Sequence, residues 1–213
     1  MIKENTQIGQ DCNIFQGAIL GEIPQDLKFE NEYSILTIGN NTTIREYVTI
    51  NRGTKDRCET TIGNNILMMA YVHVGHDTKV DDNVIIANSV QIGGHVEINQ
   101  NAIIGGSTPI HQFSKIGAFS IIGGGLRIVQ DIPPYIIAAG EPLKFSGINS
   151  IGLRRNNFSA EDRKTIKHAY KYIYKSGLNR SEAIKKIEHS FSNKKLVQSI
   201  ISFIKSSNRG IIS

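Results

Sequence analysis

The sequence predicts a mainly β protein: a left-handed parallel β-helix of hexapeptide repeats, three per coil, followed by a small α-helical C-terminal domain. Three observations predict this fold. An aliphatic residue recurs every six positions over much of the chain, and Gly, Asn and Asp fall between the recurring positions. Beyond residue 145 the spacing becomes helical and the composition strongly basic.

The six-residue repeat is unbroken over twelve hexads. Its members are Ile62, Met68, Val74, Val80, Ile86, Ile92, Ile98, Ile104, Ile110, Ile116, Ile122 and Ile128. Earlier members of the series are Ile8, Ile14, Leu20, Ile38, Ile44 and Ile50. A period of six is neither the helical 3.6 nor sustained strand alternation, and it suits short strands separated by turns. Each coil can bury its aliphatic edge only against its neighbours, so the repeat predicts a stack.

Turn-forming residues separate the expected strands. Residues 39–41, 63–65 and 81–83 are Gly-Asn-Asn, Gly-Asn-Asn and Asp-Asp-Asn, which tolerate a positive φ. Three hexads close one triangular coil, so residues 18 apart should stack at the strand spacing of about 4.8 Å.

We predict that the β-helix covers residues 1–144 and the helical domain residues 145–213. Residues 21–37 and 51–61 interrupt the repeat, and a solenoid places such insertions as loops at a corner, often on the binding side. In the C-terminal part, Ser159–Asp162 has the form of a capping box that opens a helix ending at Ser176-Gly177. Ser181 is the expected cap of a second helix, and residues 195–206 form a third.

Charge is unevenly distributed along the chain. Residues 145–213 hold 14 Lys and Arg against 4 Asp and Glu, whereas the first 144 residues hold 10 against 15. A basic segment favours an acidic partner, which can be nucleic acid, an anionic membrane surface or an acidic protein. Nucleic acid is disfavoured because the segment shows no binding motif. We predict no membrane span, no signal peptide and, with Cys12 and Cys58 as the two cysteines, a reducing cytoplasm.

Four histidines lie in the repeat at positions that face outward: His73, His76, His95 and His111. A concave site there needs a second wall, which a loop or a neighbouring subunit can supply. His73, His76 and His95 could offer three imidazoles to zinc, but the chain lacks the H-x-x-x-x-H spacing of β-helical carbonic anhydrases. We therefore predict no metal site.

The 18-residue rule gathers groups suited to acyl transfer. His76 stacks beneath Gly94, Gly94 beneath Gln112, and Asp77 beneath His95. A neutral imidazole can take the proton of an attacking hydroxyl or amine. A backbone N–H beside a residue without a side chain can hold the oxyanion of the tetrahedral intermediate.

Seven stretches carry a family resemblance: GEIPQDLKF, IREYVTINRGT, YVHVGHDTKV, GGHVEI, IGGSTPIHQF, DIPPYIIAAGEP and KHAYKYIYKSG. With these in this order, nearly the whole chain resembles the UDP-N-acetylglucosamine acyltransferases, which catalyse the first step of lipid A biosynthesis. The resemblance implies transfer of an (R)-3-hydroxyacyl chain from acyl carrier protein to the sugar 3-position. It also implies a homotrimer with active sites in clefts between subunits. The resemblance implies no bound cofactor, because the acyl donor is carried on the phosphopantetheine of the carrier protein.

The resemblance also implies residue roles. His76 matches the general base, Asp77 follows it as in the family, and Gly94 matches the backbone oxyanion donor. Gly124 matches the ruler at the end of the acyl groove, and its lack of a side chain predicts a longer acyl chain. Eight further positions match substrate contacts: Asp26, Lys28, His73, His95, His111, Gln112, Asn149 and Arg155. In the family the three histidines position sugar and acyl groups, the first two residues hold the sugar and phosphates, and the last three contact the nucleotide.

The sequence departs from the family pattern at three places. Ile151 stands where the family often has a glutamate that contacts the nucleotide, and Asn156 replaces an arginine. About three hexads precede the first insertion, fewer than family members usually carry, and we expect the site to survive this.

Alternatives remain open at the level of sequence. The acceptor can be a 3-amino sugar nucleotide, the donor can be acetyl-coenzyme A, or the chain can be an inactive scaffold. Lys164, Lys167, Lys171 and Lys175 share one face of the first long helix, so they can guide an acidic carrier protein or simply be solvated.

Overall fold

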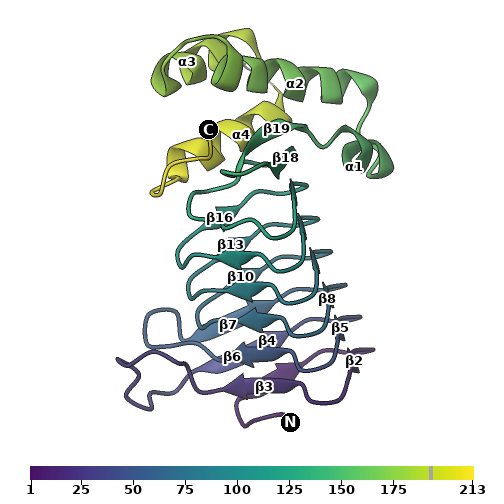
Figure 1. Ribbon diagram of the computed structural model, residues 1–213, viewed down its shortest axis with the longest axis vertical. Coiled ribbons are helices and arrows are strands. Elements are labelled where there is room, and N and C mark those ends of the chain that lie inside the picture. The colour runs from purple at the N-terminus through teal and green to yellow at the C-terminus, as the bar shows by residue number, and fades with distance from the viewer. Residues whose placement is uncertain (192–193) are drawn as a thin grey trace.

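The computed structural model describes residues 1–191 and 194–213 of the chain. A left-handed parallel β-helix with three flat faces forms a column, and helices lie across its C-terminal end (Figure 1).

Each face of the column is one sheet. Sheet 1 contains β1 (Thr6–Ile8), β4 (Ile35–Ile38), β7 (Glu59–Ile62), β10 (Lys79–Val80), β13 (Glu97–Ile98) and β16 (Lys115–Ile116). Sheet 2 contains β2 (Asn13–Ile14), β5 (Thr43–Ile44), β8 (Leu67–Met68), β11 (Ile85–Ile86), β14 (Ile103–Ile104), β17 (Ile121–Ile122), β18 (Ile136–Ala139) and β19 (Lys144–Ile148). Sheet 3 contains β3 (Ile19–Glu22), β6 (Thr49–Asn51), β9 (His73–Val74), β12 (Gln91–Ile92) and β15 (Pro109–Ile110).

The expected 18-residue register is present in the regular part of the column. In sheet 1 Val80 pairs with Ile98, and in sheet 3 His73 pairs with Gln91. Each residue therefore lies directly over the residue one coil earlier.

The hexad residues form the core, as the period predicts. All twelve members from residue 62 to residue 128 are buried, and none is more than 4% exposed. Two of the earlier members are not fully buried: Ile14 is 36% exposed and Ile8 is half-buried, because β2 and β1 are edge strands of their sheets.

The corners of the triangle require a left-handed residue in each turn. Asn41, Asn65 and Asn83 have φ values of 54°, 55° and 60°, as expected for residues that tolerate this conformation. Asp77 and His95 occupy equivalent corner positions with φ values of 56° and 60°.

Two insertions leave the column on the same side, near its N-terminal end (Figure 1). The first insertion, residues 23–34, lies between β3 and β4, and the second insertion, residues 52–58, lies between β6 and β7. Both are shorter than the interruptions expected from the repeat, because the flanking strands extend into residues 21–37 and 51–61.

The C-terminal part contains α1 (Ser150–Arg155), α2 (Ala160–Lys175), α3 (Arg180–Ser190) and α4 (Lys195–Ser206). The capping box of Ser159 and Asp162 opens α2 as expected. The prediction that Ser181 caps the next helix was wrong. Asn179 caps α3, because its side chain accepts the N–H of Glu182 while the Glu182 carboxylate accepts the Asn179 N–H. Sequence spacing did not reveal the short α1.

The end of the chain returns to the column, where Ile211 forms a parallel bridge with Asp131. Among the described residues, none of the helices is both long enough and apolar enough to span a membrane.

Substitution of two adjacent methionines, Met68 and Met69, tests which side chains of the repeat point into the core. Met68 points inward and is fully buried, whereas Met69 points outward and is half-buried. Met68→Ala should lower the free energy of unfolding by about 2–5 kcal/mol, because it leaves a cavity. Met69→Ala should cost less than about 1 kcal/mol. Guanidinium titrations of both variants measure this difference, and equal losses would contradict the inward assignment.

Candidate active site

The corner between β9 and β10 presents an imidazole–carboxylate pair. The Nδ1 atom of His76 lies 2.7 Å from Oδ2 of Asp77. The His76 side chain is 14% exposed, and that of Asp77 is fully buried. An ionised carboxylate can only accept, so Nδ1 carries the proton and Nε2 of the neutral ring is left as the proton acceptor.

The second insertion surrounds the Asp77 carboxylate. The Thr54 hydroxyl donates to Oδ2 at 2.7 Å, and the backbone N–H groups of Thr54 and Arg57 donate to Oδ1 at 3.0 and 3.2 Å. Burial by itself raises the pKa of Asp77, but the hydrogen bonds from His76 and Thr54 and the nearby His95 together hold this pKa below its ordinary value. Asp77 is therefore the ionised partner of His76.

Gly94 lies directly against the His76 ring. A Cβ atom at this position would lie 2.6 Å from the His76 Nε2 atom, so only glycine leaves the ring in its place. Among the described residues, no group accepts a hydrogen bond from the Gly94 N–H. Gly94 thus lies against Nε2 of His76, as the 18-residue rule predicts, and its N–H has no partner among the described residues.

A groove on sheet 3 runs past these groups, with a volume of about 370 Å³. It is lined by Gln25, Asn51, His73, Gly75, His76, Gln91, Ile92, Gly93, Gly94, Pro109 and Ile110. Gln25 comes from the first insertion, so that insertion borders the groove. A hydrogen bond of 2.8 Å joins His73 Nδ1 to the Thr49 hydroxyl, and burial lowers the pKa of His73.

His95 lies one coil above Asp77, as expected. Its Nε2 atom is 3.6 Å from Oδ2 of Asp77 and 3.7 Å from Oδ2 of Asp56. The ring stacks on Phe113 and meets the His76 ring edge-on, with centroid separations of 4.5 and 5.1 Å. Burial lowers the pKa of His95, and the attraction of Asp77 and Asp56 offsets this only in part.

Four other candidate residues lie around this centre. Asp26 and Lys28 line a small pocket of the first insertion with Thr54, and Asp26 Oδ1 accepts the Lys28 N–H at 3.0 Å. His111 and Gln112 are exposed at the corner one coil above Gly94.

The structure does not bring the remaining candidates into this groove. Asn149 is buried, and its side chain caps α1 by accepting the Gly152 N–H while donating to the Phe119 carbonyl, both at 2.9 Å. Arg155 is exposed at the end of α1. Gly124 is exposed at a different corner, where a Cβ atom would lie 2.9 Å from the Gly106 carbonyl oxygen.

The contacts of the second insertion were not predicted from the sequence, because its residues lie outside the repeat. Thr54 and Arg57 hold Asp77. Arg52 is 9% exposed, its guanidinium lies over the Phe29 ring, and no carboxylate within the described residues forms an ion pair with it. In the sequence, Arg52 is marked only by its place in residues 51–61, which interrupt the repeat on the expected binding side.

Among the described residues, one group of side chains could hold a metal ion. The ligand atoms of His76, Asp77 and His95 lie within 4.8 Å of one another. A metal there would have to displace the hydrogen bonds that the Asp77 carboxylate already accepts. These contacts fit a hydrogen-bonded pair better than a metal site, and the absence of a metal stays a prediction.

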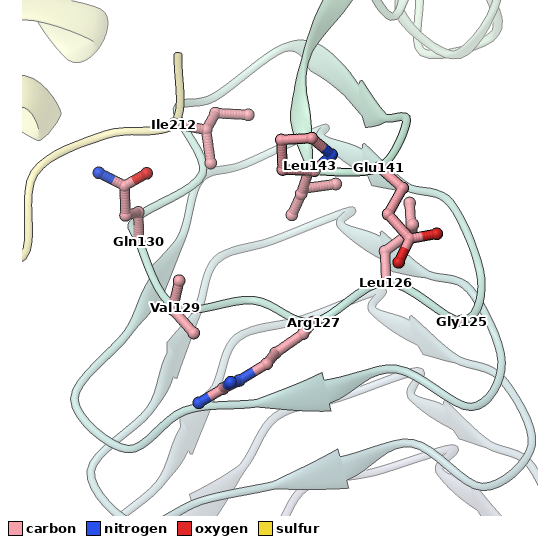
Figure 2. Close-up of a pocket in the computed structure, with 9 residues that line it drawn as sticks. Gly125, Leu126, Arg127, Val129, Gln130, Glu141, Leu143 and Ile212 are labelled. Carbon is pink, nitrogen blue, oxygen red and sulfur yellow. The ribbon is translucent and has the colours of Figure 1, made fainter.

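A separate cavity of about 530 Å³ lies where the last coil meets the returning C-terminal segment (Figure 2). Its apolar lining includes Leu126, Val129, Leu143 and Ile212, with Arg127 nearby (Figure 2). None of the candidate site residues lines it, although Gly124 immediately precedes the lining residue Gly125.

Fold and site together define an acyltransferase of the hexapeptide-repeat class. A family model described as UDP-N-acetylglucosamine O-acyltransferase, domain 2, matches residues 131–212. A protein of Aquifex aeolicus named acyl-[acyl-carrier-protein]--UDP-N-acetylglucosamine O-acyltransferase is 58% identical over 199 residues, which cover 93% of this chain and 76% of that protein. A protein of the same name from Saccharophagus degradans is 47% identical, covering 100% of this chain and 83% of its own length.

Solved structures agree with these relatives. The UDP-N-acetylglucosamine acyltransferase of Bacteroides fragilis superposes with a TM-score of 0.97 at 48% identity, covering 100% of this chain and 83% of that one. The Moraxella catarrhalis enzyme gives 0.95 at 41% identity, covering 99% and 82%. This chain belongs to the UDP-N-acetylglucosamine O-acyltransferase family.

The depressed histidine pKa values predict a loss of stability in mild acid. Burial lowers the pKa of His73 and His95, so near pH 6.5 they hold fewer protons in the folded chain than unfolded histidine, whose pKa is about 6.5. The unfolded state then binds more protons, so the free energy of unfolding should fall as the pH drops from about 7.5 through about 6.5. Denaturant titrations at several pH values measure this fall.

His95→Asn should reduce this pH dependence, and Asn tolerates the positive φ at position 95. His189→Asn, at an exposed position of α3, serves as the control and should leave the dependence unchanged. A free energy of unfolding that is flat across this range would contradict the burial argument.

Proposed function

We propose that this chain transfers an (R)-3-hydroxyacyl group from acyl carrier protein to the 3-hydroxyl of UDP-N-acetylglucosamine, with His76 as general base. The observation that carries the proposal is the position of His76. Its Nδ1 atom is bound to Asp77, while its Nε2 atom lies over Gly94 at the edge of the groove. The names of the relatives, which are O-acyltransferases, favour a hydroxyl over an amine as the acceptor.

The proposed reaction uses one base twice. Nε2 of His76 takes the proton of the sugar hydroxyl while that oxygen attacks the thioester carbonyl carbon. The Gly94 N–H donates to the oxyanion of the tetrahedral intermediate. The carbon–sulfur bond then breaks, the leaving thiolate of the phosphopantetheine receives the proton from His76, and the ester and free thiol remain. Asp77 stays ionised and stabilises the transient imidazolium.

The proposed substrate contacts follow from where each residue lies relative to His76. His73, Gln25 and Asn51 line the groove beside His76, so they are placed to contact the sugar or the acyl group. Asp26 and Lys28 lie in the insertion that borders it, so they can hold the sugar and phosphates. His111 and Gln112 extend this surface by one coil.

Of the two proposed nucleotide contacts near α1, Asn149 and Arg155, only Arg155 has an exposed side chain that could reach the nucleotide directly. Since the Asn149 side chain already caps α1, its contribution is to hold the helix that presents Arg155. Gly124 keeps its proposed role as acyl ruler. The apolar cavity that begins at the next residue supports a long acyl chain (Figure 2).

A homotrimer is proposed from the outward face of sheet 2. Five aliphatic residues form a ladder there, each half-buried and paired with the next: Leu67, Ile85, Ile103, Ile121 and Ile137. The outward positions of sheet 1 are polar or charged over the same coils, for example Lys79 and Glu97. An aliphatic stripe on one face supports burial against another copy of the chain, which would also supply the second wall of the groove.

The basic face of α2 supports docking of an acidic carrier protein. Lys167, Lys171 and Lys175 surround a pocket whose apolar lining includes Phe145 and Tyr170. Docking of this kind should weaken as salt concentration rises. Cys12 and Cys58 are unpaired, which is compatible with the cytoplasm as the place of reaction.

Removal of the base tests the proposed reaction. His76→Ala should lower kcat for transfer from hydroxyacyl carrier protein by about 10²- to 10⁴-fold, the usual contribution of a general base. Product formation is measured by mass spectrometry with the 3-hydroxy and the 3-amino sugar nucleotides. His189→Ala, an exposed histidine of α3, should retain the wild-type rate. Comparable rates in wild type and His76→Ala would exclude His76 as the base.

A charged residue introduced into the aliphatic ladder of sheet 2 tests the proposed homotrimer. Light scattering should give a trimer for the wild-type chain, and Ile103→Glu should shift the mass toward monomer, because the charge would be buried in the interface. Lys79→Glu, on the exposed outward face of sheet 1, should leave the trimer intact. A trimer that persists in Ile103→Glu would show that this ladder is not the interface.

A further inference from the structure

The second insertion contacts the catalytic pair without reaching the groove itself. Thr54 uses both of its donors on Asp77: the N–H reaches Oδ1 and the hydroxyl reaches Oδ2. Thr54 is buried, and neither it nor Arg57 is among the residues that line the groove beside His76. Thr54 also lines the small pocket with Asp26 and Lys28, so a test of its role must separate an effect on Asp77 from an effect on substrate binding.

Four donors occupy the Asp77 carboxylate, which matches its acceptor capacity of about four lone pairs. Two of these donors are on each oxygen. Oδ1 accepts the backbone N–H groups of Thr54 and Arg57, and Oδ2 accepts the Thr54 hydroxyl and His76 Nδ1. The carboxylate therefore cannot rotate without losing hydrogen bonds in a buried place, where such losses are costly.

His95 is the competitor for Oδ2. Its Nε2 atom lies 3.6 Å from Oδ2, too far for a hydrogen bond but close enough to form one after a small rotation of the carboxylate. Such a rotation would take Oδ2 away from His76 and free its ring to change tautomer. The Thr54 hydroxyl holds Oδ2 at 2.7 Å against this movement.

We propose that Thr54 is a positioning residue for acyl transfer, whose hydroxyl fixes the Asp77 carboxylate so that Nε2 of His76 is the unprotonated nitrogen. This inference rests on the proposed function, in which Nε2 of His76 is the base. Arg57 completes the clamp, because its guanidinium donates to the Asp77 carbonyl at 3.3 Å and to Glu97 Oε1 at 2.7 Å on the next coil. The second insertion is thereby fastened across two coils at the catalytic corner.

The ionisable groups around the pair set the expected pH effect. They are Asp77, His73, His95, Asp56, Arg57 and, through Arg57, Glu97. Loss of the Thr54 hydroxyl lets the Asp77 carboxylate turn toward His95 and away from the His76 ring. The protonated His76 ring then loses the carboxylate that stabilises it, so the acidic limb of the rate profile should move to lower pH.

Thr54→Val removes the hydroxyl while keeping the shape and the backbone N–H. We expect kcat to fall roughly 10- to 100-fold, as for outer partners of metal-bound imidazoles, with KM for both substrates within about twofold of wild type. Thr54→Ser should restore most of the rate. The matched control is Thr42→Val, a buried threonine whose hydroxyl donates to the Gly63 carbonyl at 3.1 Å, and it should keep the wild-type rate and pH profile.

An NMR measurement separates this inference from the proposed function. The ¹⁵N shifts of the His76 ring should report a single Nδ1–H tautomer in the wild-type chain and a mixture in Thr54→Val, whether or not transfer is observed. An unchanged tautomer and rate profile in a folded Thr54→Val variant would overturn the inference. If His76→Ala remained active, the proposed function would fail, but the tautomer measurement would still decide the role of Thr54.

Discussion

The stacking of coils in an 18-residue register is the constraint on which the rest of this structure depends. The register places the Gly94 backbone against the His76 ring, and it places His95 above Asp77. Corner hydrogen bonds fix this arrangement, since the His95 N–H donates to the His76 carbonyl at 2.9 Å and the Phe113 N–H to the Gly94 carbonyl at 3.1 Å. Each such bond contributes only about 1 kcal/mol, but the bonds repeat along the column and act together.

The catalytic corner uses a conformation that the fold already requires. The described coils turn their corners through residues with positive φ, among which asparagine recurs at Asn41, Asn65, Asn83 and Asn101. Asp77 and His95 occupy two of these left-handed positions, where Asp, Asn and His are enriched among residues other than glycine. The turn that closes the triangle therefore also aims both side chains toward the corner, and the site adds no new kind of backbone strain.

Sequence spacing predicted those parts of the molecule that follow the column's symmetry. The inward position of Ile86 and the gathering of His76, Asp77 and Gly94 follow from counting residues, because a regular helix converts spacing in sequence into position in space. The same counting says nothing of segments outside the period, which is why the contacts of Thr54 became visible only in the structure.

The C-terminal part shows a second limit. The family resemblance assigned Asn149 to the nucleotide, but its capping of α1 was not predicted, because a helix of six residues has too little apolar spacing to be recognised. At the start of α3 the cap is Asn179 and not the expected Ser181, because Glu182 completes the capping box with Asn179. Which residue caps a helix depends on its hydrogen-bond partners nearby, and a periodic pattern of apolar residues does not reveal these partners.

The transfer rate of Gly94→Ala is the measurement that tests the central claim most directly. The new methyl group would lie 2.6 Å from the His76 Nε2 atom, while the φ angle at this position requires no left-handed conformation. The flexible ring should therefore move aside without disrupting the column. The account predicts a folded protein whose rate is lower by about a hundredfold or more, since the base is displaced. A folded Gly94→Ala variant with the wild-type rate would contradict it, because the stacked imidazole and glycine could not then be the reacting centre.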